Sequence, residues 1–322
     1  MTTSAAARGA YPTRGADERV TPRQDPVVWS APQSPGPFGA ADLRVYERDG
    51  FLSCDALISP DEVAACRAEL DRMCGDPVAA ADPRAIVERA SGRIRSLFEI
   101  HRTSEVFAAL VRDPRLADRA RQILGSDVYV HQSRINLKPG FGASGFYWHS
   151  DFETWHAEDG MPRMRAVSVS VALTDNLATN GSLMIMPGSH RTFLGCAGAT
   201  PRDNYKRSLQ MQEAGTPSPG ALTRLAAEHG IEMFTGAAGS AVWFDCNCMH
   251  GSGDNITPFP RSNVFIVYNS VENAAQEPFA APVRRPEYIG ARDFTPVPRP
   301  GRAAAAPPGG PADRDTSSPG WP

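Results

Sequence analysis

The sequence has few cysteines, and none of them forms a CxxC pair. The six stand at positions 54, 66, 74, 196, 246 and 248. A disulfide framework needs a denser set in a short chain, so we expect ordinary reduced thiols. Cys246 and Cys248 precede His250 with the spacing of half a zinc site, but no second pair of similar ligands accompanies them. Zinc is therefore a weak alternative at this position.

Long apolar segments and a strong net charge are also absent. No segment approaches the roughly 18 apolar residues that a membrane-spanning helix needs. The N-terminal stretch MTTSAAARGAYPTRG lacks the apolar core of a secretory signal. The formal net charge of −3 is too small to indicate a nucleic-acid or membrane partner. We therefore expect a soluble, cytoplasmic protein with neither kind of partner.

Both ends of the chain lack hydrophobic periodicity. Residues 1–38 and 296–322 are rich in proline, glycine, alanine and arginine. Neither segment can bury enough apolar surface to offset the entropy lost on ordering, so we predict a disordered N-terminal arm and a disordered tail. The working domain then spans residues 39–295. Hydrophobic residues, which make up 41% of the chain, suffice for its core.

The order of predicted elements indicates the fold class. Three segments begin with an N-cap residue and a proline and continue with helical spacing of apolar residues: 59–74, 113–125 and 218–230. From Asp127 onward the period is mostly two, and five segments read as strands: 127–138, 166–173, 182–187, 240–245 and 263–270. This predicts an α+β, mainly β fold with an antiparallel sandwich or jelly roll.

A histidine–aspartate pair lies among the predicted strands. His149 and Asp151 are two residues apart, and side chains at i and i+2 of a strand share a face. With the distant His250 they would form the two-histidine, one-carboxylate set of non-haem Fe(II) oxygenases. Mg²⁺ and Ca²⁺ prefer all-oxygen shells instead. The HxD pattern is weak by itself, because a His–Asp pair also serves to orient a general base.

Arg261 follows His250 and adds a second kind of chemistry. Its guanidinium can bind a carboxylate through two parallel hydrogen bonds, as the far carboxylate of 2-oxoglutarate requires when the keto-acid end chelates iron. On an extended segment Arg261, Asn263 and Phe265 point to one side. The apolar run over 264–267 indicates a strand buried on both faces, whereas a surface ion pair would be followed by polar alternation. Together these features favour an Fe(II) site that uses 2-oxoglutarate and O₂.

Polar residues alternate along the first predicted strand. Gln132, Arg134, Asn136 and Lys138 take every second position. Such alternation is commonly a solvated face. In a barrel whose lumen holds a polar ligand, the same residues would line that lumen. The pattern alone leaves both readings open.

The chain resembles the ectoine hydroxylases of the phytanoyl-CoA dioxygenase-like branch of 2-oxoglutarate oxygenases. The resemblance is carried by VYVHQSRINLKPGF (128–141), FYWHSDFETWHAEDGMPRMRAVSVS (146–170), NGSLMIMPGSH (180–190) and FDCNCMHGSGDNITPFPRSNVFIVYNSVEN (244–273). It covers residues 40–290 and fails at both ends. It implies a double-stranded β-helix (jelly-roll, cupin-like) core with flanking helices. It also implies oxidation of the small molecule ectoine to 5-hydroxyectoine, while 2-oxoglutarate and O₂ become succinate and CO₂.

Carried over by position, the resemblance assigns three groups of residues. Iron would be bound by His149, Asp151 and His250. The co-substrate 2-oxoglutarate would be surrounded by Asn136, Lys138, Phe146, Ser168 and Arg261. Ectoine would contact Gln132, Trp155, Phe244, Asn263 and Phe265. Aromatic faces suit the delocalised cation of ectoine, although core packing is the rival interpretation of each aromatic residue, above all of Phe244.

Some alternatives stay open at this point. Cys248 stands where the family has threonine or another small residue, and on a regular strand through His250 its thiol would face the iron and risk oxidation. A related hydroxylase of another small zwitterion and a non-catalytic jelly-roll binder of an osmolyte are the competing functions. The resemblance also points to a homodimer, a property that the sequence itself does not determine.

Overall fold

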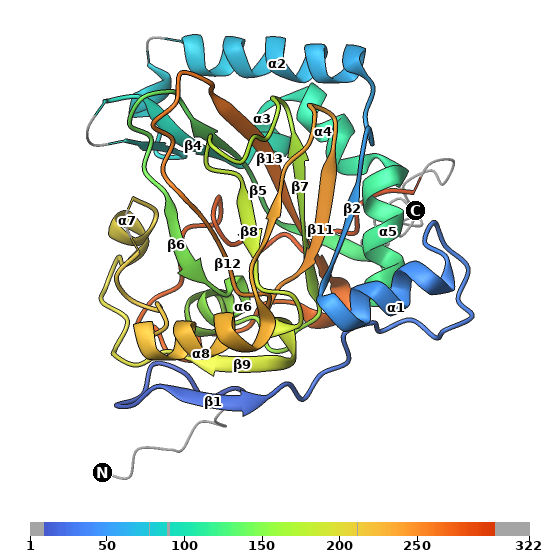
Figure 1. The fold of residues 1–322 in the computed structure, drawn as a ribbon, viewed down its shortest axis with the longest axis vertical. Coiled ribbons are helices and arrows are strands. Elements are labelled where there is room, and N and C mark those ends of the chain that lie inside the picture. Colours follow the sequence, from blue (N-terminus) through green and yellow to red (C-terminus); the bar gives the residue numbers. More distant parts are fainter. Residues whose placement is uncertain (1–9, 77, 89–90, 211, 300–322) are drawn as a thin grey trace, which may run out of the picture.

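A computed structural model describes residues 10–76, 78–88, 91–210 and 212–299. Two antiparallel sheets pack against each other, and helices cover the outer face of the larger sheet (Figure 1). The fold is α+β and mainly β: a jelly roll with flanking helices, as the sequence predicts. All six cysteines are free.

The larger sheet has seven strands in the order β2-β11-β7-β13-β5-β4-β3. Their bounds are β2 Phe51–Cys54, β3 Ala85–Val87, β4 Ile94–Phe98, β5 Val128–Lys138, β7 Ala166–Ala172, β11 Ala241–Asp245 and β13 Arg261–Ser270. Alternate residues of β13 face opposite ways: Val264 and Ile266 join the main core under the helices, whereas Phe265 joins the smaller cluster between the sheets. The polar residues of β5 therefore line the interior of the jelly roll and not a solvated face.

The smaller sheet has four short strands in the order β10-β8-β12-β6. They are β6 Phe146–His149, β8 Leu183–Ile185, β10 Glu232–Phe234 and β12 His250–Ser252. In the register of this sheet His250 lies directly opposite His149. Two histidines that are far apart in sequence thus meet across one strand pair.

The helices of the structure include the three that capping residues predict. They are α1 Ala40–Asp49, α2 Pro60–Gly75, α3 Ile100–Thr103, α4 Glu105–Arg112, α5 Pro114–Leu124, α6 Asp151–Thr154, α7 Tyr205–Ser208 and α8 Pro219–His229. Ser59 caps α2 by accepting from the Glu62 amide, a bond that stabilises a helix start by about 1 kcal/mol. Gly125 ends α5 in the left-handed conformation that glycine adopts without strain. The three helices predicted from capping are confirmed as α2, α5 and α8.

The structure differs from the sequence prediction at the N-terminal arm. Residues 10–38 are ordered, and β1 (Arg19–Pro22) pairs with β9 (Thr192–Gly195) at the bottom of the molecule (Figure 1). The buried Tyr11 donates a 2.8 Å hydrogen bond to Asp25, and Arg23 forms a 2.8 Å ion pair with Asp245. Composition missed this segment because buried polar pairs hold it in place, and a count of apolar residues does not register them. Residues 1–9 lie outside the described part of the chain.

The structure also differs from the sequence prediction at the first residues of the predicted C-terminal tail. Val297 is buried, and its amide donates a 2.8 Å hydrogen bond to the carbonyl of Val128 at the start of β5. Residues 300–322 of the predicted tail lie outside the described residues. Within the described part, no helix has the length and apolar character needed to cross a membrane.

Candidate active site

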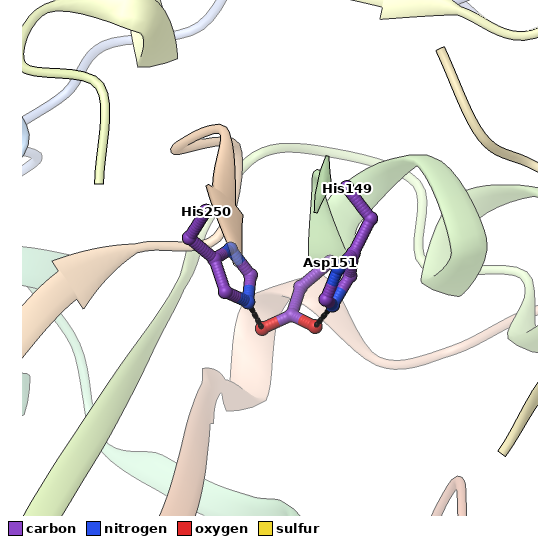
Figure 2. A group of neighbouring side chains, drawn as sticks. All are labelled: His149, Asp151 and His250. Carbon is purple, nitrogen blue, oxygen red and sulfur yellow. Dashed lines mark ion pairs between the residues drawn. The ribbon is translucent and has the colours of Figure 1, made fainter. Parts of the chain in front are cut away.

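The structure brings the three predicted iron ligands together. Nε2 of His149 lies 3.7 Å from one carboxylate oxygen of Asp151, and Nε2 of His250 lies 3.9 Å from the other (Figure 2). One potential ligand atom from each residue falls within 4.8 Å of the other two, and no other such metal-binding group occurs among the described residues. The two imidazole nitrogens and the carboxylate oxygen would occupy one side of a bound metal ion. The other coordination positions would stay open, as in non-haem Fe(II) oxygenases.

Backbone carbonyls fix the orientation of both imidazoles. Nδ1 of His149 lies 2.6 Å from the carbonyl of Tyr147, and Nδ1 of His250 lies 3.0 Å from the carbonyl of Cys248. A carbonyl can only accept, so each Nδ1 carries the proton and each Nε2 presents its lone pair to the centre. Such outer partners commonly set the tautomer of histidine ligands to metals.

The two ligands of the HxD pair do not share a strand, contrary to the sequence argument. Strand β6 ends at His149, and Asp151 is the first residue of helix α6. Ser150 holds this junction by donating a 2.9 Å hydrogen bond to the side chain of Asn247, in the turn before β12. The pair converges because the chain turns at Ser150, so the spacing was informative although the assumed conformation was wrong.

Burial and mutual proximity set the charge states of the triad. Burial, followed by the neighbouring His149, lowers the pKa of His250 to about 4, so its imidazole is neutral and able to bind a metal at neutral pH. Burial by itself would raise the pKa of the Asp151 carboxyl, but the facing histidines outweigh it and hold that pKa well below its usual value. The site therefore offers an anionic Asp151 carboxylate and a neutral His250 imidazole.

Ser168 and Arg261 extend the site on the larger sheet. The hydroxyl of Ser168 lies 3.3 Å from the carboxylate of Asp151 and can donate to it. Arg261 is almost fully buried, and no described residue accepts a hydrogen bond from its Nε or Nη2. A buried guanidinium without acceptors is costly, which indicates that an anionic group from outside the chain belongs there. The donor set thus fits a ligand that carries a carboxylate.

Lys138 lies beside Arg261 across the β5–β13 ladder. Its Nζ donates a 2.9 Å hydrogen bond to the Ser252 hydroxyl and a second one to the Gly253 carbonyl. Burial, together with Arg261 and Arg95, lowers the pKa of Lys138 to about 6. Two buried basic groups thus lie side by side on neighbouring strands, where they can accept an anionic group.

A cavity opens from the triad toward the solvent. Its wall includes His149 and Asp151 and four other residues that the sequence singled out: Gln132, Asn136, Phe146 and Trp155. Phe146 is stacked under Arg95, whose guanidinium carbon lies 3.9 Å from the ring centroid. Trp155 begins a π-helical turn, η2 (Trp155–Asp159), a conformation that is frequent at functional sites.

Three of the predicted ectoine contacts lie behind the cavity wall. Phe244 and Phe265 pack in the cluster between the sheets, as the core interpretation expected, although the Phe244 ring centroid is 5.0 Å from that of His250. Asn263 is buried, donates a 2.9 Å hydrogen bond to Ser170 and has a side-chain oxygen that no described residue satisfies. These residues surround the site, and their contact with substrate stays a prediction.

Sequence reasoning missed part of the cavity wall. Arg134 was noted only as one of the alternating polar residues, and it approaches Phe265 with its guanidinium 5.2 Å from the ring centroid. Arg285, Glu158 and Asn204 also line the cavity. Arg285 and Asn204 belong to irregular segments without a periodic signal, so only the folded chain reveals their position.

Cys248 does not meet the condition on which its oxidation hypothesis depended. Strand β12 begins at His250, and Cys248 lies in the preceding turn. Its Sγ is 3.3 Å from the carbonyl of Gly50 and packs in the cluster between the sheets. The predicted shared strand face is therefore wrong.

Comparisons with known proteins agree with this geometry. Residues 46–263 match the family model of phytanoyl-CoA dioxygenase (PhyH). The chain is 75% identical over 287 residues to the ectoine dioxygenase of Streptomyces anulatus, covering 89% of this chain and 97% of that protein. This chain belongs to the ectoine dioxygenase family. The same protein of Streptomyces coelicolor is 72% identical over 296 residues, covering 92% of this chain and 99% of the relative.

Solved structures extend the family assignment to three dimensions. EctD from S. alaskensis with 2-oxoglutarate and 5-hydroxyectoine is 46% identical with a TM-score of 0.81, and the match covers 90% of this chain and 96% of that one. The same protein with bound Fe matches equally well, at 45% identity over 90% of this chain and 98% of that one. The carbocyclase SnoK shares the fold alone, at 17% identity and a TM-score of 0.57, covering 73% of this chain and 85% of its own.

Proposed function

We propose that this protein is an Fe(II)- and 2-oxoglutarate-dependent hydroxylase that converts ectoine to 5-hydroxyectoine. The observation that carries the proposal is the buried His149–Asp151–His250 group beside an unpaired buried Arg261 in one jelly roll. Relatives that match over 97–99% of their own length at 72–75% identity are ectoine dioxygenases, and a structural match holds 2-oxoglutarate and 5-hydroxyectoine. The iron, the co-substrate and the substrate of those proteins thus fit the residues present here.

His149, Asp151 and His250 would hold Fe(II). Their neutral imidazoles and single carboxylate leave one positive charge on the centre, which then favours an anionic co-ligand. Ser168, 3.3 Å from the Asp151 carboxylate, fixes the orientation of that ligand. We assign these residues to metal binding and its support.

Arg261 and Lys138 would bind the far carboxylate of 2-oxoglutarate. Arg261 offers two free N–H groups, and Lys138 gains its charge when an anion arrives. Asn136, opposite Asn263 in the ladder, and the Phe146 ring 5.4 Å from the Lys138 ammonium close the space around the ligand. The buried position of these groups strengthens their electrostatic attraction to it.

Ectoine would occupy the open part of the cavity next to the triad. Its delocalised cation suits aromatic surfaces such as Trp155, and its carboxylate suits the guanidinium groups of Arg134 and Arg285 in the same wall. Gln132 is held on both sides, because it donates a 2.6 Å hydrogen bond to the Ile289 carbonyl and accepts one from Arg134. We assign Gln132 and Trp155 to direct contact, with Phe244, Asn263 and Phe265 in the surrounding layer.

When bound, iron and 2-oxoglutarate supply the oxidation, in which one oxygen of O₂ enters succinate and the other enters a C–H bond of ectoine while CO₂ leaves. The chain contributes orientation: its rigid walls hold the target carbon beside the metal ligands and exclude water from the site. The cavity is lined from β4 to the segment around Arg285, so residues from much of the domain take part.

Product analysis is the direct test. Purified protein is incubated with Fe(II), 2-oxoglutarate, O₂ and ectoine, and both 5-hydroxyectoine and succinate are measured by mass spectrometry. We expect equimolar products, with none from a His250→Ala variant. If no hydroxyectoine forms but another small zwitterion from a panel is hydroxylated with release of succinate, then that zwitterion and not ectoine is the substrate. If the protein binds ectoine but forms no succinate in the presence of iron, it is a non-catalytic binder of ectoine.

Localisation and assembly complete the proposal. We place the reaction in the cytoplasm, which agrees with six free cysteines. A homodimer stays a prediction from the family resemblance, and light scattering of the purified chain tests it.

A further inference from the structure

The N-terminal arm inserts a buried arginine beside the active site. Arg14 precedes β1, and its side chain is only 1% exposed. Its backbone adopts φ +54°, in the left-handed region that non-glycine residues rarely occupy. Such a conformation persists only where surrounding contacts determine it, and it is common at functional positions.

The guanidinium of Arg14 binds two carboxylates of the segment that follows Asp151. Its Nε and Nη2 donate 2.8 Å hydrogen bonds to the two carboxylate oxygens of Glu153, and Nη2 also reaches Glu158 at 3.4 Å. Both glutamates are almost fully buried, and no other described cation forms an ion pair with either. Thr13 donates a further hydrogen bond to Glu153. One arm residue therefore compensates two buried charges.

These glutamates belong to the α6–η2 segment (Asp151–Asp159). The segment begins with the iron ligand Asp151 and carries Trp155 in the cavity wall. Glu153 is in α6 and Glu158 is in η2, so Arg14 ties the two halves of the segment to each other. A shift of this segment would move a metal ligand and a cavity residue together.

A third segment, the loop over residues 196–210 and 212–215, meets at the same point. The Arg14 amide donates to the Cys196 carbonyl at 2.8 Å, and its Nη1 reaches the Thr200 hydroxyl at 3.4 Å. Asn204, which lines the cavity, donates a 2.8 Å hydrogen bond to Glu158. A Cβ at Gly215 would lie 2.1 Å from Nη2 of Arg14, so the loop approaches as closely as glycine permits. Figure 1 shows the arm along β9 beneath α6.

We propose that Arg14 is a positioning residue for ectoine hydroxylation. It holds the α6–η2 segment and the described parts of the loop, 196–210 and 212–215, in the arrangement that shapes the substrate cavity. The role rests on the proposed function, since it acts through Asp151 and Trp155 on the same site. The guanidinium fork serves both glutamates at once, whereas a lysine ammonium is a single point of charge. Arg14→Lys therefore keeps the charge but loses the geometry.

The test uses Arg14→Lys and Arg14→Gln in the full chain, with Arg19→Gln as matched control. Arg19 lies on β1 and is exposed, without a described side-chain partner. A displacement of about 1 Å can cost about a hundredfold in rate, so we expect the smaller displacement in Arg14→Lys to lower kcat/KM for ectoine by about tenfold. Hydroxyectoine formed per succinate should fall, while the KM for 2-oxoglutarate stays within about twofold of wild type.

Hydrogen–deuterium exchange of the metal-free protein gives a readout without turnover. Peptides covering 151–160 and 198–215 should exchange faster in both Arg14 variants, whereas peptides of β13 should not. If Arg14→Gln fails to fold, the exchange and kinetics of Arg14→Lys decide whether Arg14 is a positioning residue. If a variant has a lower Tm but keeps the wild-type kcat/KM for ectoine and the wild-type product ratio, Arg14 has only a structural role and the proposal is overturned.

The same experiment separates this inference from the proposed function. If the wild-type protein forms no hydroxyectoine, the proposed function fails. Exchange in the two segments still reports on Arg14 in that case, because it needs no substrate. Unchanged exchange in both Arg14 variants would overturn the positioning role whatever the substrate is.

Discussion

Replacement of Arg261 separates a ligand-binding arginine from a structural one. The side chain is almost fully buried, and two of its N–H groups have no described acceptor. Burial lowers its pKa to about 10, so below that pH the charged group opposes folding of the ligand-free protein. Arg261→Met should therefore leave the Tm of the ligand-free protein unchanged or raise it. If Arg261 instead formed a structural ion pair, its replacement by methionine would lower the Tm.

The loss should appear in 2-oxoglutarate binding. Losing a charge-assisted, bidentate contact costs about 1.5–3 kcal/mol, or roughly tenfold to a hundredfold in affinity. At a concentration one hundred times the wild-type Kd, 2-oxoglutarate stabilises the wild type by about 2.7 kcal/mol. The same concentration would stabilise the variant by only about 1.4 to 0.4 kcal/mol. Arg261→Lys should fall between wild type and Arg261→Met.

Anaerobic calorimetry and thermal melts measure both quantities on the Fe(II)-loaded and metal-free proteins. Arg112→Ala is a suitable control, because that arginine is exposed on α4 and its nearest carboxylate, Glu105, is 3.9 Å away. Unchanged 2-oxoglutarate affinity in Arg261→Met would refute the assigned role. A large drop in the Tm of the ligand-free variant would refute the argument from burial.

Three further predictions concern the remaining groups of the site. His250→Ala and Asp151→Asn should abolish stoichiometric Fe(II) binding and turnover with the fold retained, and an active His250→Ala protein would disprove the triad. Lys138, with its pKa lowered to about 6, should take up a proton when 2-oxoglutarate binds at pH 7.5, so affinity rises as the pH falls from 8 to 6. Calorimetry in two buffers of different ionisation enthalpy measures that uptake, and equal heats would contradict it. Trp155→Ala should lower the yield of hydroxyectoine more than that of succinate, and it should also cost about 3–5 kcal/mol of stability. A loss of stability with an unchanged ratio of the two products would assign Trp155 to the core alone.

Local signals in the sequence predicted most of the longer regular elements, but not the short strands β6 and β12 that carry the two histidine ligands. Helix α2 follows from the Ser59 cap, and β5 and β13 follow from alternation and apolar runs. The side-by-side placement of Arg261 and Lys138 needed the antiparallel pairing of these strands, which the sequence pattern does not specify. The structure also decided between a solvated face and a lumen for the polar side of β5.

Non-local polar contacts could not be predicted from residue patterns. The pairs Arg14–Glu153 and Arg23–Asp245 join residues from distant parts of the chain, and neither partner carries a periodic signal. They order an arm whose composition is typical of disorder. The turn at Ser150 was missed for a similar reason, because its hydrogen bond to Asn247 comes from a remote segment.

The pairing of β6 with β12 has a consequence for how the protein acquires its metal during folding. His149 and His250 are about a hundred residues apart in sequence, yet they face each other across two short strands of the smaller sheet, β6 and β12. Closing so long a loop costs entropy before any contact compensates for it, so this pairing belongs to the late stages of folding. A nascent chain that ends before residue 250 has only two of the three ligands. Iron affinity should therefore arise abruptly once synthesis has passed β12, which protects incomplete chains from binding a redox-active metal.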